Sequence, residues 1–171
     1  HLDYHKNFKN YLKAKLYLFQ QLLKKKANII ADTTIPEFKK IKSLSSKKKL
    51  NLYELQGKKN NISIISHEYQ DNKQLVKIEY KKKYYNFATD LIGKIQIKNI
   101  LMAMIAAEKS NINFKKIILT IEKIKPVHGR FEKVGKIKNK SHVILDYAHT
   151  PDALEKCLYN IKEQFKDKRI S

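Results

Sequence analysis

The segment from His142 to Lys156, HVILDYAHTPDALEK, most constrains the fold, because it predicts a β-strand that runs directly into a helix. A short apolar run at residues 143–145 is typical of a strand, and three polar or aromatic side chains follow it: Asp146, Tyr147 and His149. In an open α/β sheet, ligands bind at the carboxyl ends of strands, where helices begin. The segment therefore predicts the α/β class, with an acid, a phenol and an imidazole at a ligand crevice.

The helix after this strand has a well-specified start. Thr150 is a suitable N-cap, Pro151 suits the first helical position, and the Asp152 carboxylate favours the positive end of the helix dipole. A purely structural role in capping explains these three residues adequately. It explains Asp146 and His149 less well, so these two are the better candidates for ligand contacts.

The composition excludes some classes of protein. With 171 residues and 42% hydrophobic residues, the chain can form one ordinary domain or parts of two. Its net charge of +21 suggests a nucleic-acid partner, but only Arg130 and Arg169 are arginines. Arginine makes most bidentate base and phosphate contacts. We therefore interpret the scattered lysines as solvated faces and expect no nucleic-acid partner.

Cys157 is the only cysteine, which excludes a disulfide within the chain and favours a small buried side chain. No apolar run approaches the roughly 20 residues of a membrane span, so we expect no membrane contact. These features indicate a reducing, cytoplasmic setting. The patterned sequence at both ends indicates a piece of a longer protein.

Hydrophobic periodicity predicts alternating helical and β-rich stretches. The expected helices are Phe8–Lys26, Ile35–Leu44, Asn99–Lys109, Phe114–Ile121 and Asp152–Phe165. The expected strands are 28–32, several short runs in Leu50–Phe87, Phe131–Val134, His142–Leu145 and a further strand starting at Ile170.

Two features of this pattern bear on function. Tyr80, Tyr84, Tyr85 and Phe87 lie among lysines and could stack on bases, although aromatic residues in a hairpin more often pair across strands, which we favour. The PVHGRFE stretch interrupts the pattern with proline and glycine, and is the best candidate for a domain boundary. We predict domains at 1–124 and 125–171.

Three segments, HLDYHKNFKNYLKAKLYLF, VHGRFEKV and VILDYAHTPDALEKCL, resemble the Mur ligases in that family's order. The resemblance covers residues 1–32, 87–109 and 124–171, and DYAHTPDALEK is most similar to the branch that extends UDP-MurNAc-dipeptide to the tripeptide. It implies the later part of a central ATPase domain followed by the start of a Rossmann-like C-terminal domain.

The resemblance also implies an activity. These ligases use ATP and Mg²⁺ to join an amino acid to a UDP-MurNAc-peptide through an acyl phosphate, in the cytoplasmic synthesis of peptidoglycan precursors. The partners expected from it are therefore the UDP-MurNAc-peptide and an amino acid, with the protein a monomer.

Site residues follow by position in the matching motifs. His1 resembles the histidine that binds magnesium, and Lys15 the lysine that the family carbamylates, which would supply the oxygen ligands that Mg²⁺ prefers. The remaining matches concern the nucleotide: Asn99 for adenine, Arg130 for phosphates, Asp146 for ribose, and Tyr147 and His149 for the walls of the crevice.

The sequence departs from the family pattern in several places. Gln96 replaces an asparagine, His128 replaces a proline, and Thr33 stands where a second aspartate is frequent. No GxxGK[ST] phosphate loop occurs in these 171 residues; the family has it upstream of the position of His1, and its amino-acid recognition motif after that of Ser171. We therefore expect the 171 residues alone to be inactive.

Other interpretations remain open. The chain could derive from another ligase of the superfamily, of the cyanophycin synthetase or folylpolyglutamate synthetase type, from a basic nucleic-acid-binding module, or from a non-catalytic remnant kept as an interaction domain. The added amino acid, meso-diaminopimelate or L-lysine, is also open.

Overall fold

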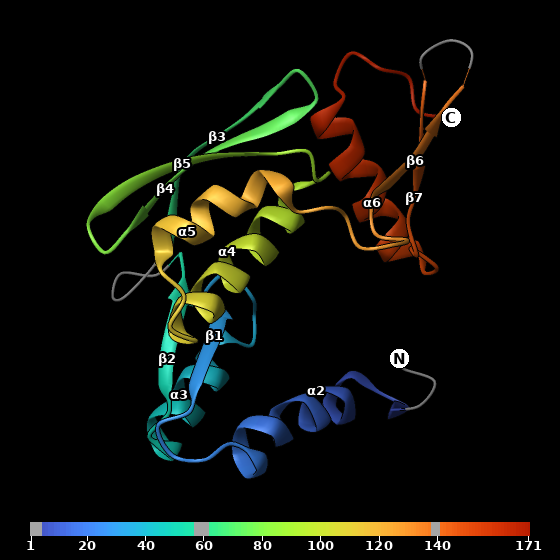
Figure 1. Ribbon diagram of the computed structural model, residues 1–171. Helices are drawn as coiled ribbons and strands as arrows, with labels where there is room; N and C mark the ends of the chain where they lie inside the picture. The colour runs from blue at the N-terminus through green and yellow to red at the C-terminus, as the bar shows by residue number, and fades with distance from the viewer. Residues whose placement is uncertain (1–4, 57–61, 138–140) are drawn as a thin grey trace. The chain divides into compact units, whose positions relative to one another are not determined.

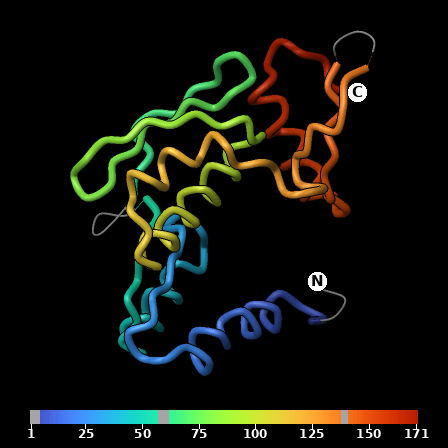
Figure 2. The backbone as a smooth tube through the Cα atoms, viewed as in Figure 1, coloured from blue at the N-terminus to red at the C-terminus, as the bar shows by residue number. Residues whose placement is uncertain are grey.

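The structure, a computed structural model, describes residues 5–56, 62–137 and 141–171. The contacts divide the chain into two compact units, His1–Ile62 and Ser63–Ser171, and each is described by itself. The predicted boundary at 124–125 lies inside the second unit and stays a prediction. Figure 2 traces the backbone of both units.

The first unit is a small α/β assembly. It contains helix α2 (Phe8–Tyr17), the π-helical turn η1 (Leu18–Leu22), strand β1 (Asn28–Asp32), helix α3 (Phe38–Lys48) and strand β2 (Asn51–Leu55) (Figure 1). β1 and β2 are parallel, with Asn28 opposite Asn51 and Asp32 opposite Leu55. Its core consists of Ile29 and Ala31 of β1, Ile41 of α3, and Leu50, which directly precedes β2.

Two helix boundaries in this unit differ from the prediction. The helix expected to reach Lys26 ends at Leu22, and Lys26 adopts a positive φ of 64°. The helix expected from Ile35 begins at Phe38, because the Asp32 carboxylate accepts hydrogen bonds from the Thr34 N–H (2.9 Å) and hydroxyl (2.8 Å). These bonds hold a turn directly after β1.

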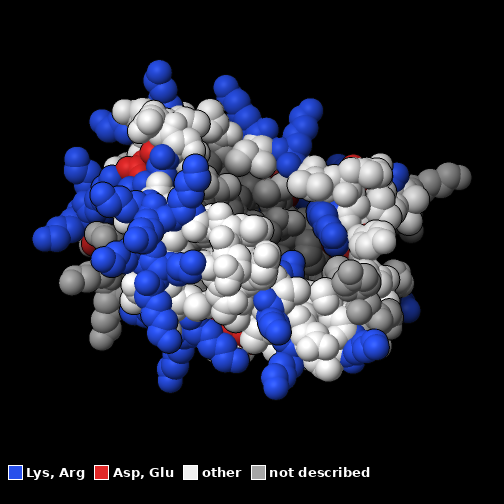
Figure 3. Space-filling model, turned by 90° about the horizontal axis from the view of Figure 1, so that it is seen from below, with Lys and Arg blue, Asp and Glu red and all other residues white. Residues whose placement is uncertain are grey.

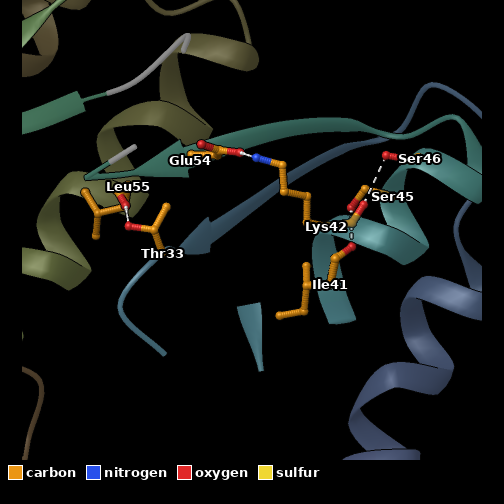
Figure 4. A network of polar contacts seen from close by, with 7 residues as sticks. All are labelled: Thr33, Ile41, Lys42, Ser45, Ser46, Glu54 and Leu55. Atoms are coloured by element: carbon orange, nitrogen blue, oxygen red, sulfur yellow. Dashed lines mark hydrogen bonds and ion pairs between the residues drawn. The ribbon is translucent and has the colours of Figure 1, made fainter. Parts of the chain in front are cut away.

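Polar contacts connect the elements of this unit (Figure 4). The Thr33 hydroxyl donates to the Leu55 carbonyl over 2.9 Å, and Lys42 on α3 forms a 2.8 Å ion pair with Glu54 on β2. Thr33, which departs from the family pattern, thus has a structural role at the carboxyl end of β1.

The second unit begins with β-strands and two helices. Strands β3 (Ile62–Gln70), β4 (Lys73–Tyr80) and β5 (Lys83–Thr89) are neighbours in that order, and α4 (Lys94–Lys109), α5 (Phe114–Thr120) and the short 3₁₀ helix η2 (Ile121–Lys123) follow. β4 and β5 form an antiparallel hairpin, as predicted. α4 starts five residues earlier than predicted, with Ile97, Ile100, Leu101, Met104 and Ile105 buried.

The aromatic residues of the hairpin pack against a helix. Tyr80 stacks on Phe114 of α5 with centroids 4.4 Å apart, and Tyr85 meets the same ring edge-on at 4.9 Å. The strand register places Tyr85 opposite Ile78 and Phe87 opposite Val76. Tyr85 and Phe87 therefore pair across strands, as predicted, with aliphatic partners, and α5 supplies an aromatic neighbour for Tyr80 and Tyr85.

The second unit ends with a strand–strand–helix stretch. β6 (Glu132–Lys136) pairs antiparallel with β7 (His142–Leu145), and α6 (Pro151–Gln164) follows. The Thr150 hydroxyl accepts from the Ala153 N–H at 3.3 Å, which confirms the predicted cap. Cys157 is buried with Ile92, Phe131 and Phe165, also as predicted. The strand predicted from Ile170 is absent from the described residues 165–171.

The architecture is mixed α/β, as predicted. Among the helices that the structure describes, none has the length and apolar character needed to cross a membrane.

Candidate functional site

The pairing of β6 with β7 builds the candidate site. Because Glu132 lies opposite Leu145 in an antiparallel pair, the residues before β6 and after β7 meet at one end of the hairpin. There the Tyr147 N–H donates to the Gly129 carbonyl over 2.9 Å, and the Phe131 N–H donates to Asp146 Oδ2 over 3.0 Å. Gly129–Phe131 and Asp146–Tyr147, two segments distant in the sequence, thus meet in one turn.

Three of the predicted residues form an exposed cluster beside this turn. The Arg130 guanidinium lies 5.3 Å from the centroid of the Tyr147 ring, and the His149 ring meets that of Tyr147 edge-on at 5.0 Å. His149 Nδ1 is 2.9 Å from the Tyr147 carbonyl oxygen, so Nδ1 carries the hydrogen of this bond. The arrangement presents a cation, a phenol and an imidazole to solvent.

A cavity of about 310 Å³ lies beside Asp146. Its walls come from the amino end of α4, from α6 and from the turn: Lys94, Ile95, Lys98, Phe131, Asp146, Ala153, Lys156, Cys157 and Asn160. This volume is at the lower end of the range for small-molecule sites, roughly 300–1,000 Å³. An acid beside three lysines on partly apolar walls suits an anionic ligand that also carries hydroxyl groups.

Electrostatics within the cavity favour an unreactive thiol. Burial raises the pKa of Cys157, and the nearby Asp146 carboxylate raises it further. Cys157 is therefore a wall residue rather than a nucleophile.

Asn99 and Lys15 lie on helices α4 and α2. Asn99 is exposed on α4, where its side-chain amide donates to Gln96 Oε1 over 3.3 Å. Lys15 belongs to the first unit, is exposed, and holds its ammonium 5.5 Å from the Tyr11 ring centroid. His1 lies outside the described residues.

The described residues do not fit a magnesium ion as they stand. Within residues 5–56, 62–137 and 141–171, no group of three or more His, Cys, Asp or Glu side chains could hold a metal. As an ammonium group, Lys15 has no oxygen to offer a hard cation.

Sequence reasoning missed the three lysines of the cavity, Lys94, Lys98 and Lys156. Lysine is abundant throughout the chain, and Lys and Arg side chains are spread widely over the face shown in Figure 3. Only two positions offered a signal: Lys98 precedes Asn99, and Lys156 is the last residue of the DYAHTPDALEK motif.

The sequence has close relatives among bacterial ligases. It is 38% identical over 162 residues to UDP-N-acetylmuramoyl-L-alanyl-D-glutamate--2,6-diaminopimelate ligase of Rickettsia bellii, covering 95% of this chain and 33% of that protein. It is 34% identical over 174 residues to the ligase of the same name from Buchnera aphidicola, covering 98% and 34%. The chain thus spans about a third of the length of these relatives.

Solved structures share the fold. MurF from Acinetobacter baumannii superposes with a TM-score of 0.79 at 13% identity, covering 95% of this chain and 35% of that one. An FPGS–AMPPCP complex gives 0.74 at 15% identity, covering 100% and 42%. At these identities the likeness concerns the fold alone.

Two family domains match the sequence in order along the chain. Residues 129–171 match the Mur ligase glutamate ligase domain. Residues 1–107, more than half of the chain, match the Mur ligase middle domain, and the chain therefore belongs to the Mur ligase family.

Proposed function

We propose that this chain is part of an ATP-dependent amide ligase that adds an amino acid to UDP-MurNAc-dipeptide in peptidoglycan precursor synthesis. The observation that carries the proposal is the turn that joins Gly129–Phe131 to Asp146–Tyr147, beside a lysine-lined cavity. The relatives' shared name supports diaminopimelate as the added amino acid. We further propose a monomer in the cytoplasm, without nucleic-acid or membrane partners.

The reaction divides into two transfers. The substrate carboxylate takes the terminal phosphoryl group of ATP, ADP leaves, and the amine of the amino acid then displaces phosphate to form the amide. Such chemistry depends mainly on positioning and on stabilising charge. The residues of this chain would supply one wall of the nucleotide site.

Each nucleotide residue has a proposed role that its geometry allows. Phe131 N–H holds Asp146 by Oδ2, and we assign the other carboxylate oxygen to the ribose hydroxyls. Arg130, exposed above Tyr147, is proposed to reach the phosphates, and Tyr147 and His149 to line the crevice. Asn99 on α4 is proposed to contact adenine.

The magnesium proposal requires a modification. A carbamate on Lys15 would convert its ammonium group into an oxygen donor, and His1 would complete the pair of ligands. Intact mass spectrometry in bicarbonate buffer tests this directly, with Lys15→Arg as the control that cannot form the carbamate.

The activity is tested on the reading frame extended in both directions. We expect formation of the UDP-MurNAc-tripeptide with stoichiometric ADP when ATP, Mg²⁺, UDP-MurNAc-dipeptide and meso-diaminopimelate are supplied, and much less with L-lysine. The 171 residues alone should form no product, because they contain no phosphate loop. Absence of product with either amino acid contradicts the proposal, and product from the 171 residues alone contradicts the expected inactivity.

A further inference from the structure

Two buried glutamines lie on either side of Gly93, at the point where α4 begins. The Gln74 side chain on β4 is fully buried, and its Nε2 donates to the carbonyls of Leu91 (2.6 Å) and Gly93 (3.2 Å). Gln164, at the end of α6, is 6% exposed and accepts from the Gly93 N–H over 3.0 Å. The Gln164 amide also donates to the Asn72 carbonyl over 3.0 Å.

Both glutamine side chains are hydrogen-bonded to the backbone around Gly93, a contact that we call the Gly93 joint. Gln74 uses its amide hydrogens on two carbonyls, so its Oε1 accepts from His67 Nε2, 2.8 Å away. Buried amides are costly unless they are bonded in this way, so replacing one of them disturbs a specific geometry.

At the Gly93 joint, α6 lies close to the backbone at the start of α4. Gly93 has a φ of 88°, and a Cβ placed there would lie 2.9 Å from Asn160 Oδ1. One residue further on, Lys94 forms a 3.3 Å ion pair with Glu163. Asn160 and Glu163 of α6 therefore lie against Gly93 and Lys94, where α4 begins.

The two helices that meet at the Gly93 joint, α4 and α6, also line the cavity. Lys94, Ile95 and Lys98 on α4 face Lys156, Cys157 and Asn160 on α6 across the cavity. The two helices that meet at Gly93 therefore also supply walls of the cavity.

We propose that Gln164 is a positioning residue: by binding the Gly93 N–H and the Asn72 carbonyl, it holds α6 on the amino end of α4 and keeps the cavity beside Asp146 at the width that a nucleotide requires. This inference rests on the proposed function for the identity of the ligand. The helix-to-helix contact itself does not depend on that identity.

Cys157 provides an internal reporter of this contact. It is the only cysteine of the chain, it is 7% exposed, and it lines the cavity between the two helices. A dipyridyl disulfide reacts with a thiol to give the mixed disulfide and free thiopyridone, whose absorbance gives the rate. The rate for the urea-unfolded chain divided by the rate for the folded chain gives the protection factor of Cys157.

The test compares Gln164→Leu, Gln164→Glu and the wild-type chain. We expect Gln164→Leu, which loses both bonds, to lower the protection of Cys157 by about tenfold or more, because local opening becomes easier. Gln164→Glu keeps an acceptor for the Gly93 N–H but loses the donor to Asn72, so its protection should be intermediate. The control is Gln70→Leu on the exposed end of β3, which should match the wild type.

Circular dichroism and thermal unfolding identify variants that fold. If Gln164→Leu does not fold, Gln164→Glu decides alone. Wild-type protection in every folded Gln164 variant overturns the proposal.

A second measurement separates positioning from plain structural support. We expect the Kd for Mg–ATP, followed by the protection that ATP gives to Cys157, to rise at least fivefold in Gln164→Leu or, if that variant does not fold, at least twofold in Gln164→Glu. An unchanged Kd with faster thiol modification overturns the positioning role. If the wild-type chain binds no ATP, the proposed nucleotide site fails, while the thiol rates still decide whether Gln164 holds the helices together.

Discussion

At the scale of residues, Gly93, Gly129 and Gly135 differ in what a side chain would meet. Gly93 has a φ of 88° and Asn160 atoms within 2.9–3.1 Å of an added Cβ. Gly129 has a φ of 69° with open space around it, and Gly135 has neither a positive φ nor a close neighbour. The three positions therefore separate backbone strain from steric overlap.

We predict a graded loss of stability when alanine replaces each glycine. Gly129→Ala should lower the free energy of unfolding by about 1 kcal/mol, because an L-residue is strained at positive φ. Gly93→Ala adds overlap with Asn160 and should cost about 2–3 kcal/mol, whereas Gly135→Ala should change stability by less than about 0.5 kcal/mol. Urea unfolding measures the series, and equal losses at Gly93 and Gly129 contradict the packing at Asn160.

His67 makes stability depend on pH. Burial lowers its pKa below the usual 6.5 and the charge of Lys94 lowers it further, although the bond to Gln74 and the charge of Glu163 raise it. The unfolded chain therefore binds this proton more readily, and stability is lost as pH falls below about 6.5 toward the folded pKa. We predict that His67→Gln loses less stability than the wild type between about pH 7 and pH 5. Parallel losses in urea titrations at the two pH values would rule this out.

At the scale of elements, the β4–β5 turn is strained by its own residues. Lys81 and Lys82 have φ values of 51° and 60°, which a two-residue turn of this hand requires and which glycine or asparagine adopts at lower cost. Lys81 also forms an ion pair with Glu108 on α4, which a substitution would remove. Lys82 has no such bond among the contacts described.

We predict that Lys82→Gly raises the free energy of unfolding by about 0.5–1 kcal/mol, because relief of strain exceeds the added freedom of the unfolded chain. Lys83→Gly makes the same chemical change one residue later, inside β5, and should lower stability by about 0.5–1 kcal/mol. Denaturant melts of the pair provide the measurement. A loss at both positions would show that the turn is not strained.

Local patterns predicted the elements whose signals are local. The alternation in β4 and β5, the apolar run of β7 and the Thr150–Pro151 cap of α6 all depend on adjacent residues, and the structure contains each of them. The start of α4 was missed because the polar Lys94, Gln96 and Lys98 conceal the buried Ile97. The start of α3 was missed because a side-chain turn at Asp32 competes with helix formation.

Only part of the candidate site was predictable, because some of its contacts join residues that are distant in the sequence. The sequence motifs predicted Arg130, Asp146, Tyr147 and His149 as site residues, and the β6–β7 pairing brings Arg130 beside Tyr147. Gln74 and Gln164 are separated by 90 residues, and each resembles an ordinary polar position in its own segment. Contacts of this kind appear only once the chain is folded.

At the scale of the whole molecule, the net charge of +21 competes with the site as an explanation of anion binding. Any polyanion will be attracted to so many lysines, and such attraction is screened by salt. A specific nucleotide site must therefore be recognised by where ATP binds and by what adenosine adds to phosphate alone.

An NMR titration of the ¹⁵N-labelled chain with Mg–ATP, with Mg–tripolyphosphate as the matched polyanion, tests for a specific nucleotide site at the turn beside Asp146. We expect ATP to shift the amides of residues 93–99, 129–131 and 146–153 at concentrations where tripolyphosphate does not. We also expect Asp146→Asn to abolish these shifts while the fold is retained. Shifts spread over the lysine-rich surface and equal for the two ligands, or no shifts at the turn, would contradict it.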